Sequence, residues 1–298
     1  MIDKQPARGV IYQISKTRHA AVLVCSVASL RNHWRGPVQI IAGCFESQAV
    51  AEAIAGDDRL CGGFSSVEVV PWKAPLERGA GYANKTLVRD LCHFRQAIFL
   101  DADTLVVGSL GGLFPTEAAP VVLTQFADWW STGKRIKGRT EKWRHVAPEL
   151  VELSQRAPGV PAVNTGVFGF DRDESKPWFD EWRDLTHKNV SFICDEIAAQ
   201  LLVRPAGHGG VPVRVVGPVY NASPIYPGGE AAGVKVWHFH GKKHLRREAG
   251  RRLWVPWLEA AMAEDWAGIR GWEPAGLGDP SLRSYLADPG KFLAKYSK

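Results

Sequence analysis

Short apolar segments alternate with longer helix-like segments over the first hundred residues of the chain. The apolar and β-branched runs predict strands at residues 9–14, 38–42, 67–70 and 97–100. The segments between them predict helices at residues 20–32, 48–55 and 84–95. Because strands that alternate with helices indicate a parallel sheet with crossover helices, we expect an α/β fold whose ligands bind beyond the carboxyl ends of the strands.

The second half of the chain is less regular. Strands are predicted at residues 121–124 and 163–170, and helices at residues 178–187 and 196–203. Residues 129–144 form a basic stretch that is interpreted as a solvated loop, with a flexible lid or an acceptor surface as the alternative. Its cationic residues are Lys134, Arg135, Lys137, Arg139, Lys142 and Arg144. No linker divides the sequence clearly, so we expect one domain with a C-terminal extension.

Composition and charge narrow the class of protein. The 298 residues are 45% hydrophobic and 23% charged, which is ordinary for a soluble globular domain. No apolar run approaches the ~20 residues of a membrane helix and no apolar secretion segment follows the first residues, so a cytoplasmic protein is expected. The five cysteines form no C-x-x-C pair, which argues against a disulfide framework or a zinc knuckle. The net charge of +6 favours an anionic partner such as a nucleotide, a nucleic acid or an acidic membrane surface.

The strongest chemical signal is a pair of carboxylates at the end of an apolar strand. Residues 97–100 read Ala-Ile-Phe-Leu and run directly into Asp101, Ala102 and Asp103. Two carboxylates this close together indicate a cation between them, and Mg²⁺ or Mn²⁺ suits such oxygen ligands. The ion can bridge the phosphates of a nucleotide and neutralise charge on a departing diphosphate. An Asp-x-Asp pair has little specificity alone, and the apolar strand before it adds to its weight.

Residues 99–106, Phe-Leu-Asp-Ala-Asp-Thr-Leu-Val, resemble the Asp-x-Asp signature of glycosyltransferase family 8, the glycogenin and bacterial galactosyltransferase family. Four further segments resemble motifs of that family in the same order: Lys85, Asn164-Thr165-Gly166-Val167, Asp195-Glu196 and Trp237-His238-Phe239-His240-Gly241. The resemblance implies the GT-A nucleotide-diphospho-sugar transferase fold, with a single Rossmann-like catalytic domain over residues 1–245 and a mainly parallel sheet. Residues 246–298 are expected to form a helical or irregular extension packed on that domain.

The resemblance also implies a role for each matching residue. Asp101, Asp103 and His238 are expected to bind the metal, Mn²⁺ or Mg²⁺. Asp195 and Glu196 are expected to lie near the anomeric carbon or to bind the acceptor hydroxyl, as the catalytic pair. Contacts with the donor are expected from a larger set, namely Ser15, Lys85, Arg89, Asp101, Ala102, Asn164, Thr165, Gly241 and Lys243.

The chain departs from the family pattern at several positions. The residue after Asp195 is Glu196 where the family has Gln, and Lys242-Lys243-His244 stands where it has Lys-Pro-Trp. The loop after the first strand offers only Ser15 to the nucleoside. Lys85 and Arg89 lie one helical turn apart in the predicted helix, so a solvated face is the alternative to phosphate contact.

Other assignments also have structural alternatives. His238 and His240 could be strand histidines without a ligand, although strand alternation puts them on one face, so both could point to a metal. Asn164 could be a turn residue before Gly166. Asp195 could be a helix N-cap, which is compatible with a role in a site.

The activity implied by the resemblance is transfer of a hexose from UDP-glucose or UDP-galactose to a hydroxyl acceptor, with retention at the anomeric carbon. The acceptor could be a glycan, a lipid-linked sugar or a small molecule. Inversion stays open because Glu196 could act as a base on the acceptor. A transferase acting on modified bases of viral DNA is an alternative, which the basic stretch and the 12 Trp residues permit. A non-catalytic nucleotide-sugar-binding protein is a third hypothesis, against which the intact Asp-x-Asp, His238 and Asp195 argue.

Overall fold

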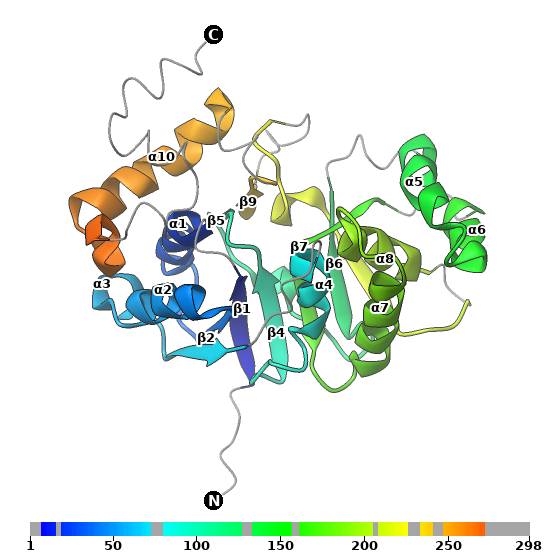
Figure 1. Cartoon of the computed structure of the whole chain (residues 1–298), viewed down its shortest axis with the longest axis horizontal. Coiled ribbons are helices and arrows are strands. Elements are labelled where there is room, and N and C mark those ends of the chain that lie inside the picture. Colours follow the sequence, from blue (N-terminus) through cyan, green and yellow to red (C-terminus); the bar gives the residue numbers. More distant parts are fainter. Residues whose placement is uncertain are drawn as a thin grey trace, which may run out of the picture.

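A seven-stranded sheet with helices on both faces forms the centre of the molecule (Figure 1). The computed structural model describes residues 7–15, 19–72, 80–126, 133–156, 161–204, 208–225, 233–240 and 247–271. Across the sheet the strands lie in the order β3 (Val67–Pro71), β2 (Val38–Ala42), β1 (Arg8–Ile14), β4 (Gln96–Leu100), β7 (Val163–Asp171), β6 (Val121–Gln125) and β8 (Val213–Val216). β7 runs antiparallel to both its neighbours and every other pair is parallel. The predicted α/β fold with a mainly parallel sheet is therefore confirmed.

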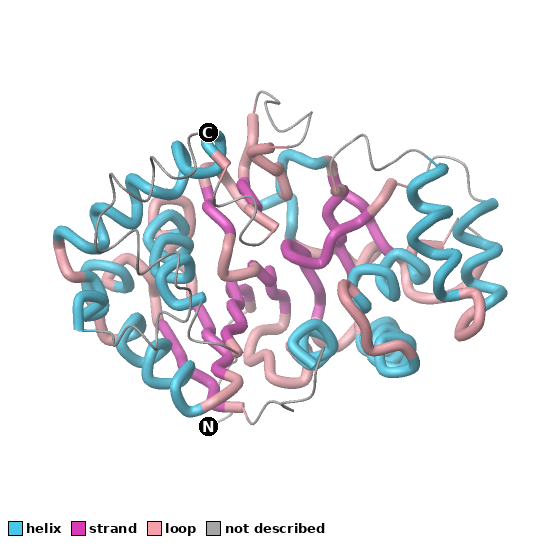
Figure 2. The backbone as a smooth tube through the Cα atoms, turned by 45° about the horizontal axis from the view of Figure 1, so that its top comes forward, coloured by secondary structure: helices cyan, strands magenta, loops and turns pink. Residues whose placement is uncertain are grey.

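Both faces of the sheet are buried, which explains the nearly continuous apolar strands. In β1, Val10, Tyr12 and Ile14 belong to one hydrophobic cluster and Ile11 belongs to another. The first cluster includes α1 (Ala20–Leu30), α2 (Phe45–Ala55) and α3 (Asp58–Cys61), and the second includes α6 (Pro148–Arg156), α7 (Lys176–Lys188) and α8 (Cys194–Leu202). Figure 2 shows these helices on either side of the strands.

A second, two-stranded sheet lies beyond the carboxyl end of β4 (Figure 1). In it β5 (Thr104–Val106) pairs antiparallel with β9 (Val236–His238), so Thr104 faces His238. Helix α10 (Glu248–Ala263) packs along α1, and Leu105, Phe239 and Leu258 share a third hydrophobic cluster there. Distant parts of the chain thus meet directly after the Asp-x-Asp pair.

The remaining elements are short. They are the α-helices α4 (Ala80–Ala83) and α5 (Gly133–Thr140), and the 3-10 helices η2 (Asn84–Leu87), η3 (Gly111–Leu113), η5 (Glu141–Trp143), η6 (Pro218–Tyr220) and η7 (Trp266–Gly271). Among the described helices, none is long and apolar enough to cross a membrane. All five cysteines are free thiols, as their spacing predicts.

Two predictions from local sequence are wrong. The helix expected over residues 84–95 is reduced to η2 followed by turns. The buried Gln39 side chain of β2 accounts for this, because its Nε2 donates to Leu91 O and its Oε1 accepts from His93 N, which are groups that a helix would pair internally. In the basic stretch, the expected loop contains helix α5, and Arg139 in that helix is buried.

Candidate functional site

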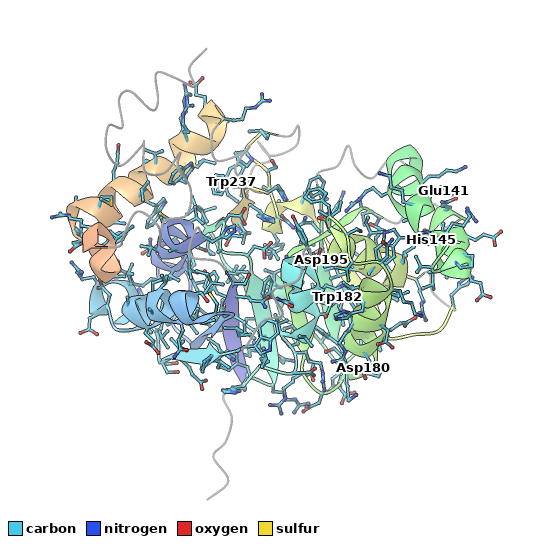
Figure 3. The ribbon with its side chains drawn as sticks, in the orientation of Figure 1. Glu141, His145, Asp180, Trp182, Asp195 and Trp237 are labelled. Carbon is cyan, nitrogen blue, oxygen red and sulfur yellow. The ribbon has the colours of Figure 1, made fainter. Side chains whose placement is uncertain are left out.

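The candidate site lies at the edge of the sheet where β4 ends. Because β7 is antiparallel to β4, the start of β7 meets the end of β4, and Asp101 N donates to Gly166 O at 2.7 Å. β9 brings His238 to the same edge through its pairing with β5. The first turn of α8 brings Asp195, which Figure 3 shows beside Trp182 of α7. Four separate segments therefore meet at one place.

Asp101, Asp103 and His238 form a cluster, called here the metal cluster, whose ligand atoms all lie within 4.8 Å of one another. His238 Nε2 is 3.3 Å from Asp103 Oδ1 and 3.6 Å from Asp101 Oδ2. Phe239 N donates to Asp103 O at 3.0 Å, which holds the β9 end against the Asp-x-Asp turn. Two carboxylates and one imidazole converging in this way make a donor set that suits a divalent ion such as Mn²⁺.

Gly166 is required by the close packing of the metal cluster. A Cβ at this position would overlap the His238 ring and would lie 2.8 Å from Asp101 Oδ2. Only glycine lets the β7 backbone come this close to both ligands. The Asn-Thr-Gly sequence thus has a physical reason at its third residue.

Lys85 links the metal cluster to Asp195. Its Nζ lies 3.0 Å from Asp101 Oδ1 and 3.5 Å from Asp195 Oδ2. Burial alone would lower the pKa of Lys85, but the two carboxylates more than offset it and hold that pKa above its ordinary value. Burial raises the pKa of Asp101, and nearby Asp103 adds to the rise, although Lys85 and His238 oppose it. The ionised form of Asp101 is therefore disfavoured even with Lys85 beside it.

Asp195 is a buried carboxylate with one oxygen left over. Thr165 Oγ1 donates to Asp195 Oδ2 at 2.7 Å, and Trp182 Nε1 donates to Asp195 O at 2.7 Å. Oδ1 is buried without a hydrogen-bond partner among the described residues. Asp195 is not an N-cap, since α8 begins at Cys194 and the cap position is Ile193. A buried carboxylate oxygen without a donor is costly unless a ligand supplies one.

Both carboxylate oxygens of Glu196, by contrast, have partners. Its Oε1 forms an ion pair with Arg139 of α5, and its Oε2 accepts from Asn164 Nδ2 at 2.8 Å. Asn164 Oδ1 in turn accepts from Gly166 N at 2.8 Å and from Asn221 Nδ2 at 2.9 Å. Asn164 therefore joins the Glu196 carboxylate to the start of β7.

Some predicted donor residues are not brought to the metal cluster. Arg89 Nε donates to Arg172 O at 2.7 Å and its NH1 pairs with Asp90. Arg172 directly follows β7, whose end pairs with Gln96 at the start of β4, so Arg89 lies at the opposite end of that strand from Asp101. The helical turn expected to carry it toward the phosphates is absent, so its assignment as a donor contact is wrong.

The other residues predicted to contact the donor lie at different parts of the chain. Ala102 is buried between the two aspartates. Ser15 directly follows β1, at the carboxyl edge, where its carbonyl oxygen accepts from Cys44 Sγ at 3.8 Å. Gly241 and Lys243 lie outside the described residues. His240 does not continue the strand, since its φ is 47°, yet its ring centroid is 3.9 Å from that of His238.

Two residues of this site carry no signal in the sequence. Asn221 follows η6, and its Oδ1 is 2.8 Å from His238 Nδ1. Arg139 is one of six cations in the basic stretch, and its burial against Glu196 distinguishes it from Lys137, Lys142 and Arg144, which are exposed. An amphipathic helical pattern over residues 133–140 is the one sequence signal that would have indicated that one face of this segment is buried.

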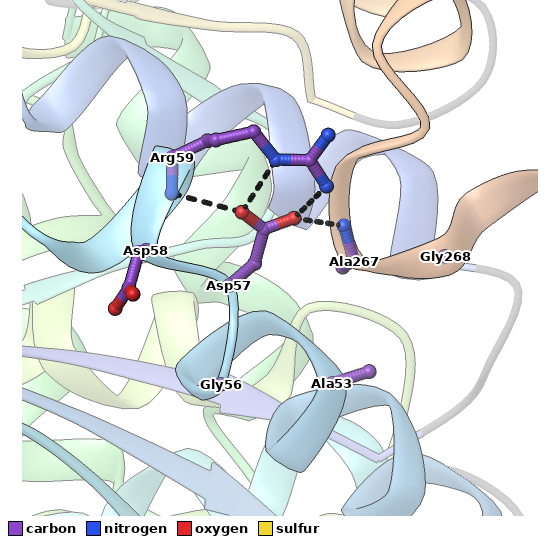
Figure 4. A pocket seen from close by; sticks show the side chains of 7 residues that line it. All are labelled: Ala53, Gly56, Asp57, Asp58, Arg59, Ala267 and Gly268. Carbon is purple, nitrogen blue, oxygen red and sulfur yellow. Dashed lines mark hydrogen bonds and ion pairs between the residues drawn. The ribbon is translucent and has the colours of Figure 1, made fainter.

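Another carboxylate, that of Asp57, lies far from the metal cluster, in a surface pocket of about 330 Å³ between α2, α3 and η7 (Figure 4). Asp57 accepts there from Arg59 N at 2.9 Å and from Ala267 N at 2.6 Å, and its Oδ2 pairs with Arg59 NH2 at 2.6 Å. Arg59 also donates to the carbonyl oxygens of Glu264 and Asp265. We call these residues the C-terminal latch, because they tie the segment after α10 to α3.

Comparison with known proteins identifies the fold to which this site belongs. No family model and no curated protein matches the sequence. Among solved structures, galactosyltransferase LgtC in complex with donor and acceptor sugar analogues has a TM-score of 0.59 at 16% identity, over 87% of this chain and 99% of its own. An active-site variant of LgtC with glutamine replaced by glutamate has a TM-score of 0.57 at 18% identity, over 86% of this chain and 95% of its own.

A mammalian enzyme is also similar in fold. Mouse xyloside xylosyltransferase 1 has a TM-score of 0.52 at 12% identity, over 79% of this chain and 98% of its own. At these identities the likeness concerns the fold. The chain therefore has the GT-A glycosyltransferase fold that the sequence resemblance implies.

Proposed function

We propose that this protein is a metal-dependent glycosyltransferase that moves a hexose from a nucleotide diphosphate sugar, UDP-glucose or UDP-galactose, to a hydroxyl acceptor with retention. The observation that carries the proposal is the meeting of Asp101, Asp103 and His238 at the carboxyl edge of a GT-A sheet, beside Lys85 and Asp195. Residues 1–245 would form the catalytic domain and residues 246–298 its extension.

The residues of the metal cluster fit a divalent cation. Two carboxylates and an imidazole are ligands that Mn²⁺ accepts, and burial has raised the pKa of Asp101 in a place where added positive charge would lower it. Bound there, the ion would supply charge neutralisation to the departing diphosphate. Gly166 keeps this position open by leaving room for the His238 ring.

Other residues bind and orient the substrates. Lys85 places its ammonium group beside Asp101 and would donate a hydrogen bond to a phosphate oxygen of the donor. Asn164 and Thr165 would lie against the donor sugar, while Gly241 and Lys243 would contact the diphosphate. Asp195 keeps one buried oxygen without a donor, so a sugar or acceptor hydroxyl would complete its hydrogen bonds.

The contacts of Glu196 bear on stereochemistry. An inverting enzyme needs a carboxylate that takes the acceptor proton. Both oxygens of Glu196 already accept from Arg139 and Asn164, which supports a positioning role for Glu196 and favours retention. Galactosyltransferase LgtC was solved with donor and acceptor sugar analogues, and we extend the same pair of substrate classes to this chain.

A hydrolysis screen over UDP-, GDP- and CMP-sugars with Mn²⁺ tests the proposal. We expect release of UDP from UDP-glucose or UDP-galactose, and loss of that release when the metal is chelated. Calorimetric titration with UDP and GDP in the presence of Mn²⁺ gives an independent reading. Tighter binding of GDP would exclude the proposed donor, and hydrolysis that persists with chelator would exclude the metal.

A further inference from the structure

Asn221 is a buried residue at the candidate site that the proposed chemistry does not use. It exposes 1% of its surface and lies between the metal cluster and Asn164. Its Nδ2 is 2.7 Å from Thr124 Oγ1 and 2.9 Å from Asn164 Oδ1, and its Oδ1 is 2.8 Å from His238 Nδ1. One side chain thus contacts both a metal ligand and the partner of Glu196.

Backbone groups determine which way the Asn221 amide faces. Thr124 Oγ1 lies 2.7 Å from Val167 O and 3.3 Å from Asn164 O, and carbonyl oxygens can only accept, so these carbonyls take the one hydroxyl hydrogen. Thr124 Oγ1 must then accept from Asn221, and the group of Asn221 that can donate is the NH₂. Oδ1 of Asn221 therefore faces His238.

This orientation selects one tautomer of His238. In a neutral imidazole one nitrogen carries the hydrogen and the other keeps a lone pair. Because Asn221 Oδ1 only accepts, the hydrogen lies on Nδ1 and the lone pair lies on Nε2. Nε2 is the atom that faces Asp103 at 3.3 Å and Asp101 at 3.6 Å. The Nε2 lone pair and the two carboxylates together form a set of ligands that suits a cation.

The second contact of Asn221 continues toward Glu196. Gly166 N donates to Asn164 Oδ1, so the amide of Asn164 is also oriented by the backbone. Its Oδ1 accepts from Asn221, and its Nδ2 donates to Glu196 Oε2 at 2.8 Å. Asn221 therefore supports the position of Glu196 through Asn164.

We propose that Asn221 is a positioning residue that holds His238 with Nε2 toward the metal and Asn164 toward Glu196. The inference rests on the proposed function in its assignment of a metal to the cluster. Outer residues that orient a histidine ligand typically change metal affinity by about tenfold to a hundredfold when removed. Asn221→Leu, close in size and without polar atoms, should weaken Mn²⁺ binding by about that factor.

The first measurement is made without metal. Long-range ¹H–¹⁵N correlation spectra of the histidine-labelled, metal-free protein, recorded about two pH units above the reference pKa near 6.5, report the tautomer of each neutral ring. The signal of His238 among the nine histidines is assigned by its loss in His238→Ala. We expect the Nδ1–H form in the wild type and its loss in Asn221→Leu. An Nε2–H form in the wild type would overturn the proposal.

The second measurement is the Mn²⁺ dissociation constant of matched variants. Asn221→Asp keeps an acceptor for His238 but loses the donor to Asn164, so Mn²⁺ affinity should hold while the transfer rate falls. Thr124→Val removes one of the two acceptors of Asn221 Nδ2 and leaves the other, Asn164 Oδ1, to orient the amide, so Mn²⁺ affinity should change by less than about threefold. In the His238→Ala background, Asn221→Leu should cause no further loss, because Asn221 acts through that ring.

The outcomes separate this inference from the proposed function. Equal Mn²⁺ affinity of the wild type and a folded Asn221→Leu overturns the positioning role and leaves the metal site standing. A further loss in the His238→Ala background indicates general repacking and also overturns it. If the wild type binds no Mn²⁺, the proposed metal dependence fails, and the tautomer in the metal-free protein still decides what Asn221 does.

Discussion

The metal cluster and the C-terminal latch both place carboxylates beside a cationic side chain, but the pKa of the carboxylate is shifted in opposite directions at the two places. At the latch, Arg59 and Ala267 N supply donors to both oxygens of Asp57. Burial would raise the pKa of Asp57, but the hydrogen bonds from Arg59 and Ala267 outweigh it and lower that pKa. At the metal cluster, burial and Asp103 raise the pKa of Asp101 in spite of Lys85.

This difference in pKa distinguishes a carboxylate that stabilises the fold from carboxylates that can accept a ligand. A carboxylate with a full set of donors stabilises the fold and has no capacity for another cation. Burial and Asp103 disfavour the ionised form of Asp101 even with Lys85 beside it, so a further cation would stabilise that carboxylate. We therefore expect changes at the metal cluster to alter ligand binding and changes at the latch to alter the free energy of unfolding.

The largest effect is expected from Asp103→Asn. Asparagine keeps the shape but removes one charge from the ion, and the loss of compensation on the departing diphosphate should cost several kcal/mol. Sugar transfer with Mn²⁺ should fall by at least about a hundredfold, while the unfolding transition stays in place. Turnover measured against Asp57→Asn provides the control. Wild-type turnover of Asp103→Asn would remove the metal from the proposed mechanism.

A smaller effect distinguishes the two neighbouring histidines. His238 Nε2 faces both carboxylates, whereas His240 packs its ring on His238 and lies edge-on to Phe126 at 4.7 Å between centroids. His238→Ala should weaken Mn²⁺-dependent UDP binding by at least about tenfold, since a direct ligand matters no less than its supporting residues. His240→Ala should weaken it far less in the same titration. Equal losses would mean that the metal ligand is assigned to the wrong histidine.

These residues also show what can be read from sequence. Asp101, Asp103, His238, Lys85 and Asp195 follow short-range patterns or family motifs, and the structure brings all five together. Six strands of the large sheet were predictable because apolar runs bounded by polar residues depend on neighbouring positions alone, whereas β5, β8 and β9 were not predicted.

Other features depend on contacts made only in the fold. Asn221 is recognisable only once Thr124 and His238 lie beside it, although 97 residues separate it from Thr124. The same holds for residues 84–95, where Gln39 of a distant strand takes the hydrogen bonds of the expected helix. Tertiary partners outweighed local helix propensity at this segment.

At the latch, Asp57→Asn should lower the free energy of unfolding by about 1–2 kcal/mol near neutral pH, through loss of a buried charge-assisted hydrogen bond. The pKa of Asp57 is lower in the folded state than its ordinary value. Its stabilisation is therefore complete above about pH 4 and is lost as the pH falls through the folded pKa. Chemical denaturation of both proteins at pH 7 and pH 3 should show the gap narrowing in acid. A gap independent of pH would assign the stability to packing instead of charge, and Mn²⁺ binding should be unchanged in either case.

The smallest effect concerns the backbone that Asp57 holds. Ala267 has φ 53° and ψ 23°, a left-handed conformation that costs an L-residue about 1–2 kcal/mol. Ala267→Gly relieves this strain, but it also removes a buried methyl group worth about 0.8 kcal/mol and adds about 0.5–1 kcal/mol of backbone freedom to the unfolded chain. These terms nearly cancel, so the free energy of unfolding should change by less than about 0.5 kcal/mol. Ala51→Gly is the matched control, because Ala51 is also buried but lies within the right-handed helix α2, where nothing offsets the two losses. That variant should lose about 1–2 kcal/mol in the same denaturation experiment. Equal losses at the two alanines would mean that Ala267 is not strained, and that the latch holds a relaxed turn.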